Sequence, residues 1–95
     1  MIPIIFQVYQ NYPNPFNPST NISYDLPENS FVTISIFDMI GRTIKEHLFE
    51  KVSAGRHSIN WNGLDNNGSS VPAGVYFYSV RTKNNFETKK MILLK

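Results

Sequence analysis

The chain has 95 residues and no cysteine, which excludes a disulfide framework, thiol chemistry and a cysteine-ligated metal site. This absence does not decide the compartment, because a cysteine-free β-domain is stable in either redox setting. No apolar run approaches the roughly 20 residues that a membrane-spanning helix needs. We therefore expect no membrane span.

Strong charge is also missing, since the net charge is only +2, and this is too little to indicate a nucleic-acid-binding surface. The acidic residues are scattered, and neither Gly-x-Ser-x-Gly nor His-Glu-x-x-His occurs. We expect no catalytic residues, no enzymatic activity, no cofactor and no metal site. Oxygen-bearing side chains from Asp65 to Gly68 resemble a calcium loop, but the later acidic ligand is missing. A tight turn is the favoured interpretation, and a weak metal site stays open.

Long runs of alanine, leucine and glutamate are absent, and isoleucine, valine, threonine and aromatic residues are plentiful, which favours strands. A hydrophobic content of 41% and an aromatic content of 14% indicate a packed domain rather than disorder. The length corresponds to one small domain. We assign residues 1–10 to an N-terminal lead-in or linker remnant and residues 11–95 to that domain.

A period of two dominates the chain, with apolar and polar residues alternating as they do along half-buried strands. The pattern predicts strands at 21–26, 31–37, 43–49, 57–61, 75–82 and 86–94. Residues 38–41 are expected to form the turn of a hairpin, with Gly41 at positive φ. Residues 83–85 are expected to form another, since asparagine tolerates left-handed backbone. Together these features predict an all-β fold, an immunoglobulin-like antiparallel β-sandwich of about seven short strands.

Three prolines, Pro13, Pro15 and Pro18, fall within six positions. Proline lacks an amide donor and has a fixed φ, so this segment cannot run through a helix or a central strand. The residue before each proline is also pushed toward extended backbone. We predict a rigid extended lead-in that holds Tyr12 and Phe16 at a fixed spacing.

Several motifs follow one another in a specific order along the chain. They are the opening Phe6-Gln7-Val8-Tyr9-Gln10-Asn11-Tyr12-Pro13-Asn14-Pro15-Phe16-Asn17-Pro18-Ser19-Thr20, the strand stop Leu26-Pro27, the turn Phe37-Asp38-Met39-Ile40-Gly41-Arg42, Ala54-Gly55-Arg56-His57, Trp61-Asn62-Gly63, Val71-Pro72-Ala73-Gly74-Val75-Tyr76-Phe77, Lys90-Met91 and the terminal Lys95. In this order they resemble the C-terminal sorting domain of proteins exported by the bacterial type IX secretion system. The sequence departs from the family at Asn62, where an aspartate is commoner. The sandwich is also similar to the immunoglobulin-like domain of flagellar hook-cap proteins.

The resemblance implies a sorting and secretion signal that is a substrate rather than a catalyst. Its partners would be the type IX translocon, a sortase-like peptidase that commonly removes the domain, and an N-terminal cargo protein. The domain would pass through the periplasm and reach the cell surface or the medium.

The resemblance also implies roles for particular residues. Recognition would fall on the tail, which consists of Lys89, Lys90, Met91, Ile92, Leu93, Leu94 and Lys95. A structural role would fall on Tyr12, Pro13, Asn14, Pro15 and Phe16, and on Gly41, Gly55 and Gly74 as turn positions. Without the resemblance, the tail has the pattern of an ordinary last strand. We expect deletion of residues 89–95 to abolish export while the sandwich stays folded.

A second function class is a carbohydrate-binding or adhesive accessory module. Trp61, Tyr76 and Tyr78 would then form a sugar-stacking platform, although aromatic residues on one face of a strand usually belong to the core. A third class is a structural assembly domain like that of the hook-cap proteins. Exposure of Trp61 would favour the second class.

Overall fold

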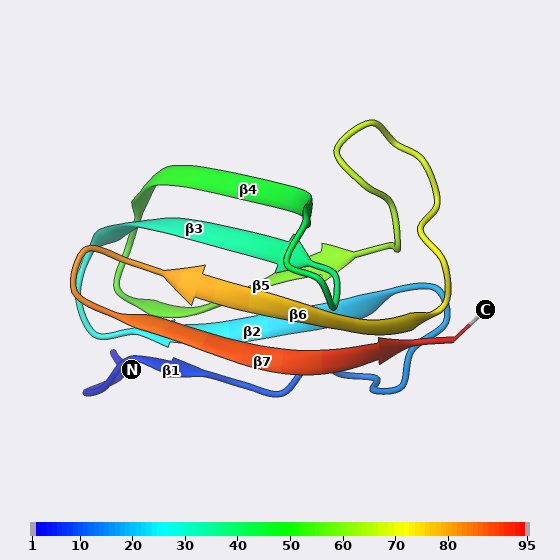
Figure 1. The fold of residues 1–95 in the computed structure, drawn as a ribbon. Helices are drawn as coiled ribbons and strands as arrows, with labels where there is room; N and C mark the ends of the chain where they lie inside the picture. The colour runs from blue at the N-terminus through cyan, green and yellow to red at the C-terminus, as the bar shows by residue number, and fades with distance from the viewer. Residues whose placement is uncertain (1, 95) are drawn as a thin grey trace.

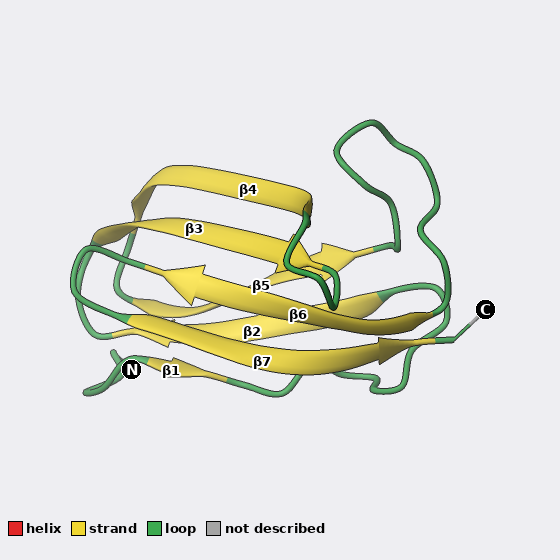
Figure 2. Ribbon diagram, in the orientation of Figure 1, coloured by secondary structure: helices red, strands yellow, loops and turns green. Residues whose placement is uncertain are grey.

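The computed structural model describes residues 2–94. These residues contain seven strands, joined by loops and turns, and no helix (Figure 2). The strands are β1 (Gln7–Val8), β2 (Thr20–Leu26), β3 (Ser30–Phe37), β4 (Thr43–Val52), β5 (Gly55–Trp61), β6 (Gly74–Arg81) and β7 (Phe86–Leu93). No helix in this part of the chain is long and apolar enough to cross a membrane.

The strands form two antiparallel sheets that lie face to face (Figure 1). The three-stranded sheet has the order β1-β2-β5, and the four-stranded sheet has the order β4-β3-β6-β7. The predicted fold class is therefore confirmed. The predicted hairpin over residues 31–49 is the pair β3 and β4, and β6 and β7 form the second hairpin.

The core lies between the sheets and is built by the alternation that the sequence displays. On each inner strand, every second side chain points inward and is buried, whereas its neighbours face out. The buried hydrophobic side chains on the strands are Val8, Ile22, Tyr24, Leu26, Val32, Ile34, Ile36, Trp61, Tyr76, Tyr78, Val80, Met91 and Leu93. Phe16 joins them from the proline-rich segment, so that segment is part of the packed domain.

The two hairpin turns use different backbone conformations. Gly41 has φ of +88°, as the sequence predicts for a glycine in this turn. The expected left-handed asparagine in the β6–β7 turn is wrong, because no non-glycine residue between positions 2 and 94 has positive φ. That turn closes instead through Thr82, whose amide donates to the Asn85 carbonyl (2.9 Å) and whose Oγ1 accepts from the Asn85 amide (3.1 Å).

β1 lies within the segment predicted as a lead-in, and it pairs with β2 through Gln7 and Val8. A polar cluster fastens this end of the chain across the sheet. Asp25 accepts hydrogen bonds from the Tyr9 hydroxyl and from Arg56 Nε (2.8 Å to Oδ1), and the Arg56 guanidinium lies 4.6 Å from the Tyr9 ring centre. The hydrogen bond from Arg56 lowers the pKa of Asp25 more than its burial raises it.

Candidate recognition surface

The predicted recognition tail is divided between the core and the surface. Met91 and Leu93 are buried in the core, and Lys89 is half-buried with its ammonium 3.3 Å from Glu87. On the opposite face of β7, Lys90 and Leu94 are exposed and Ile92 is half-buried, while Lys95 lies outside the described residues. Of the described tail residues, Lys90, Ile92 and Leu94 therefore lie on the outward face, and Lys89 is half-buried on the inward one.

The proline-rich segment runs beside β7 and covers part of its outer edge (Figure 1). The Phe16 amide donates to the Ile92 carbonyl (3.0 Å), and the Leu94 amide donates to the Phe16 carbonyl (2.8 Å). The Ile92 amide donates to Asn14 Oδ1 (3.0 Å), and Gln10 Nε2 donates to the Lys90 carbonyl (2.7 Å). The segment therefore acts as a neighbouring strand for the last half of β7.

The side chains predicted to have a structural role in this segment occupy different environments. The Phe16 ring is 1% exposed and lies 5.7 Å from the Trp61 ring, whereas the Tyr12 side chain is 80% exposed. Pro13 and Pro15 are exposed, and the Pro13 carbonyl accepts from Thr20 Oγ1 (2.8 Å). Only the second of the two aromatic residues is therefore an anchor.

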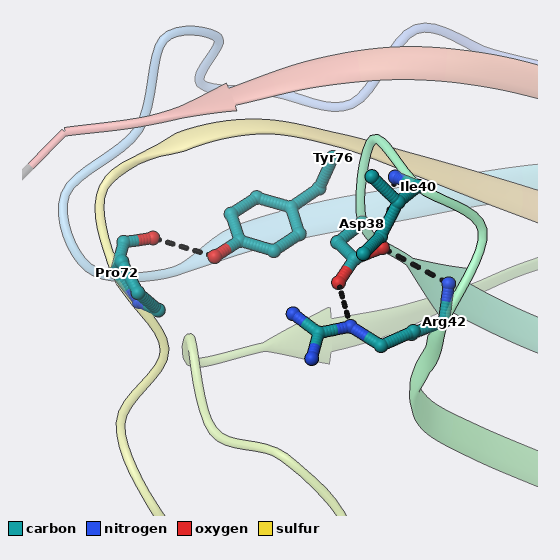
Figure 3. Close-up of polar contacts among 5 residues, drawn as sticks. All are labelled: Asp38, Ile40, Arg42, Pro72 and Tyr76. Carbon is teal, nitrogen blue, oxygen red and sulfur yellow. Dashed lines mark hydrogen bonds and ion pairs between the residues drawn. The ribbon is translucent and has the colours of Figure 1, made fainter.

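A second feature is the turn between β3 and β4, shown in Figure 3. Asp38 Oδ1 accepts from the amides of Ile40 (3.0 Å) and Arg42 (2.9 Å), and Oδ2 accepts from Arg42 Nε (2.8 Å). Burial opposes ionisation of the carboxyl group, but these hydrogen bonds outweigh it and hold the pKa of Asp38 below its usual range. The acidic side chain thus organises its own turn.

A groove of about 550 Å³ lies between this turn and the segment that leads into β6. The exposed side chains of Met39 and Ile40 stand at its rim. Within it, the Tyr76 hydroxyl donates to the Pro72 carbonyl (2.6 Å), and burial raises the pKa of that hydroxyl (Figure 3). The Asp38 carboxylate and the Tyr76 hydroxyl are both engaged in hydrogen bonds within the fold, and Met39 and Ile40 contribute exposed apolar surface to the groove.

No metal centre is formed by the part of the chain that the structure describes, since no three acidic or histidine side chains gather there. Asp65 Oδ1 accepts from the amides of Asn67 and Ser69, both at 2.9 Å, so the oxygen-rich segment is held as a turn by its own aspartate. The His57 ring packs against Tyr24 in a tilted arrangement, with the ring centres 5.7 Å apart. These groups serve the fold.

The interpretation of the aromatic residues Trp61, Tyr76 and Tyr78 as core is confirmed, and the alternative of a sugar-stacking platform is not supported. Trp61 is 1% exposed, and Tyr76 and Tyr78 are buried with it, because all three project from the inner faces of their strands. Trp61 Nε1 donates to the Leu64 carbonyl (2.9 Å), and the Tyr78 hydroxyl donates to the Tyr9 carbonyl (2.7 Å). Burial raises the pKa of Tyr78 to about 12.

Two polar contributions could not be found from the sequence. Asn11 is buried, its amide donates to the Tyr78 hydroxyl (2.8 Å), and its Nδ2 donates to Thr20 Oγ1 (3.0 Å). Asn66 covers the outer edge of β4, since its amide donates to the Ile44 carbonyl (2.9 Å). These contacts join separate segments of the chain, and the alternation of apolar and polar residues does not indicate which segments meet.

The family described as the secretion system C-terminal sorting domain matches residues 10–94. The chain belongs to this family. No curated protein sequence matches the sorting domain. Family membership supports a role as a C-terminal signal of type IX secretion, and with it export to the cell surface or secretion.

Solved structures show the same architecture. The sorting domain is similar to dimeric latent PorU from Porphyromonas gingivalis (22% identity, TM-score 0.74), covering 99% of this chain and 10% of that one. PorZ, a surface component of the type IX secretion system of the same organism, is similar over 95% of this chain and 11% of its own (22% identity, TM-score 0.63). FlgD from P. aeruginosa is similar over 78% of this chain and 57% of its own (25% identity, TM-score 0.63). The sorting domain thus spans about a tenth of PorU and PorZ and just over half of FlgD, and the resemblances stated from the sequence are confirmed.

Proposed function

We propose that this sorting domain directs an attached N-terminal cargo protein through the outer-membrane type IX translocon. The observation that carries the proposal is the family match over residues 10–94, which includes the tail strand. In this proposal the cargo passes through the periplasm, the translocon recognises the domain, and a sortase-like peptidase then removes it. The domain is the substrate of both steps.

The exposure of the tail residues supports separate roles for the two faces of β7, one in packing and one in recognition. Met91 and Leu93 hold the strand in the core, so a partner meets the other face, where Lys90, Ile92 and Leu94 stand. A basic residue beside two aliphatic side chains offers one charge-assisted contact and a small apolar surface. Lys95 belongs to the proposed signal through the resemblance alone.

An export assay tests the proposal. Residues 6–95 are fused behind a reporter that carries an inner-membrane signal peptide, in a host with a working type IX system and in a host that lacks the translocon. We expect the reporter at the cell surface or in the medium of the competent host only. A reporter retained in the periplasm of both hosts would contradict the proposal.

Surface variants then locate the signal without disturbing the core. Lys90→Glu combined with Leu94→Ser changes two exposed side chains of the tail, and we expect it to stop export. Lys83→Glu in the β6–β7 turn is the matched control, since it makes the same charge change at another exposed position. Each purified variant is checked for an unchanged melting temperature. Normal export of the tail variant would show that recognition lies elsewhere on the domain.

A further inference from the structure

The two sheets differ by one strand, and this leaves the middle of the inner face of β4 only partly covered, although Ile44 and Val52 pack against the core. β1 lies beside β7, so the three-stranded sheet ends at β5 before it reaches the position opposite β4 (Figure 1). The inward side chains of β3, which are Val32, Ile34 and Ile36, are fully buried. Their partners across the strand pair, Phe49, His47 and Lys45, face the same side, but none of them is buried.

The partly covered strip continues on β5. The inward side chains of β2 are buried, whereas His57 and Ile59, which stand beside them on β5, are only half-buried. Phe49 on β4 remains 37% exposed. His47 Nε2 is shielded from solvent and has no hydrogen-bond partner among residues 2–94. Burial and the nearby charge of Lys45 lower the pKa of His47, so the strip is mainly apolar with Lys45 as a positive charge.

The backbone of β5 presents a regular row of unused hydrogen-bonding groups. On β2, the backbone groups of Asn21 and Ser23 point away from β5, because they bond to Tyr12 and Tyr9. Antiparallel pairs alternate between bonded and non-bonded, so the partners of these two residues, Asn60 and Ser58, also point their backbone groups away from β2. Asp25 and Arg56 form the next pair of the same kind, so the backbone groups of Arg56 also point away from β2. Outside the strand ladder, no backbone hydrogen bond among the described residues reaches these three positions.

The β5 edge also lacks the protection seen on the edges of the four-stranded sheet. The proline-rich segment covers part of β7, and Asn66 covers part of β4 through Ile44 and Glu46. β5 pairs with β2 without a register shift over its whole length, and it contains no proline and no lysine. A regular edge of this kind, without a bulge, is a template for adding another strand.

We propose that the β5 edge docks an extended peptide segment, which joins the three-stranded sheet as a fourth strand and lies opposite β4. Its backbone pairs with Arg56, Ser58 and Asn60. Alternate side chains of the segment point toward β4, with apolar residues against Phe49 and a carboxylate or hydroxyl group near Lys45. This surface lies at the other edge of the sandwich from β7, so the inference goes beyond the sorting role.

The geometry favours a single strand over a second copy of the domain. If two copies joined through their β5 edges, the β3 of each copy would cover its own β5. The β4 of each copy would then need the place that the β3 of the other copy occupies. A lone extended segment meets no such conflict, because the position opposite β4 is one strand wide.

The test uses a display library of short random linear peptides, selected on the 95-residue chain. We expect selected peptides to alternate apolar and polar residues and to protect the amides of Arg56, Ser58 and Asn60 from hydrogen exchange. Ser58→Pro removes an outward amide without removing a bond to β2, and it should weaken binding at least about tenfold. Thr88→Pro is the matched control, because its amide points away from β6 on a strand at the other edge of the sandwich, and it should bind as the unchanged protein does.

A second pair of variants keeps the test valid if Ser58→Pro does not fold. Phe49→Lys charges the face toward the added strand, and Leu48→Lys makes the same change on the opposite face of β4. Binding should fall in the first and persist in the second. Peptides that bind both proline variants equally, a library without binders, or a concentration-dependent dimer that Ser58→Pro abolishes would each overturn the proposal.

Discussion

At the scale of single residues, Phe16 ties the proline-rich segment to the core. Its ring is buried against Trp61 although it belongs to no strand. Truncation of a buried phenylalanine removes its transfer free energy and leaves a cavity, so Phe16→Ala should cost about 3–5 kcal/mol of unfolding free energy. Urea denaturation monitored by tryptophan fluorescence measures this loss of unfolding free energy, since Trp61 is the neighbour that loses contact.

Tyr12 provides the matched control in the same segment. Its side chain is 80% exposed, and its backbone makes the contacts with Asn21. Tyr12→Ala should therefore change the unfolding free energy by no more than about 0.5 kcal/mol. Equal losses in the two variants would contradict the assignment of Phe16 as the anchor.

Asp25 makes the stability of the domain depend on pH. Its folded-state pKa lies below the unfolded value of about 4, chiefly because Arg56 donates to the carboxylate. As the pH falls, the unfolded state therefore binds the proton before the folded state does. The contribution of Asp25 to the free energy of unfolding is complete above about pH 4 and is lost as the pH falls through the lower folded pKa.

Asp25→Asn should remove this part of the pH dependence and cost about 1–3 kcal/mol at neutral pH, because the hydrogen bonds to the carboxylate weaken. Melting temperatures between neutral and acidic pH measure the difference from the unchanged protein. Glu50→Gln, at an exposed position, should leave the curve as it is. Parallel curves for Asp25→Asn and the unchanged protein would contradict the assignment.

At the scale of elements, the last half of β7 depends on a neighbour that is not a strand. Asn14 accepts from the Ile92 amide through its side chain, so one residue replaces a ladder bond at this edge. Asn14→Ala should cost about 0.5–1.5 kcal/mol and speed hydrogen exchange at the Ile92 amide. Exchange rates by NMR measure it, with the exposed Asn67→Ala as control. Unchanged protection of Ile92 would mean that this contact does not form in solution.

Alternation predicted most elements because it reports which side chains share a face. It located β2 to β7 within a few residues, and Asp38 with Gly41 located the turn between β3 and β4. It favoured the core for the face that carries Trp61, and that interpretation is confirmed. It also missed the two-residue β1, which is too short to show a period.

The resemblance identified the family, and pairing between distant segments set the rest of the site. The sequence pattern does not show that Asn14 and Phe16 contact β7, nor that β4 lies beyond the edge of the opposite sheet. These contacts follow from the order of strands in each sheet, which alternation does not encode. They decide which faces of β7 and β5 remain open to a partner.

At the scale of the whole molecule, the tail cannot be separated from the fold, and this changes the truncation experiment. Met91 and Leu93 are buried, so deletion of residues 89–95 should cost about 4–10 kcal/mol. A 95-residue domain is stable by only about 5–14 kcal/mol. We therefore expect this deletion to unfold most of the population, contrary to the expectation from the sequence.

Deletion of residues 94–95 alone should keep the sandwich folded, because it removes one exposed leucine and one amide bond to Phe16. Near-ultraviolet circular dichroism and the cooperativity of urea unfolding distinguish the two deletions. Export lost in the shorter deletion would then reflect lost recognition, whereas export lost in the longer one would reflect lost structure. A cooperative transition in the longer deletion would show that the sandwich closes without Met91 and Leu93, and only then could that deletion report on the signal.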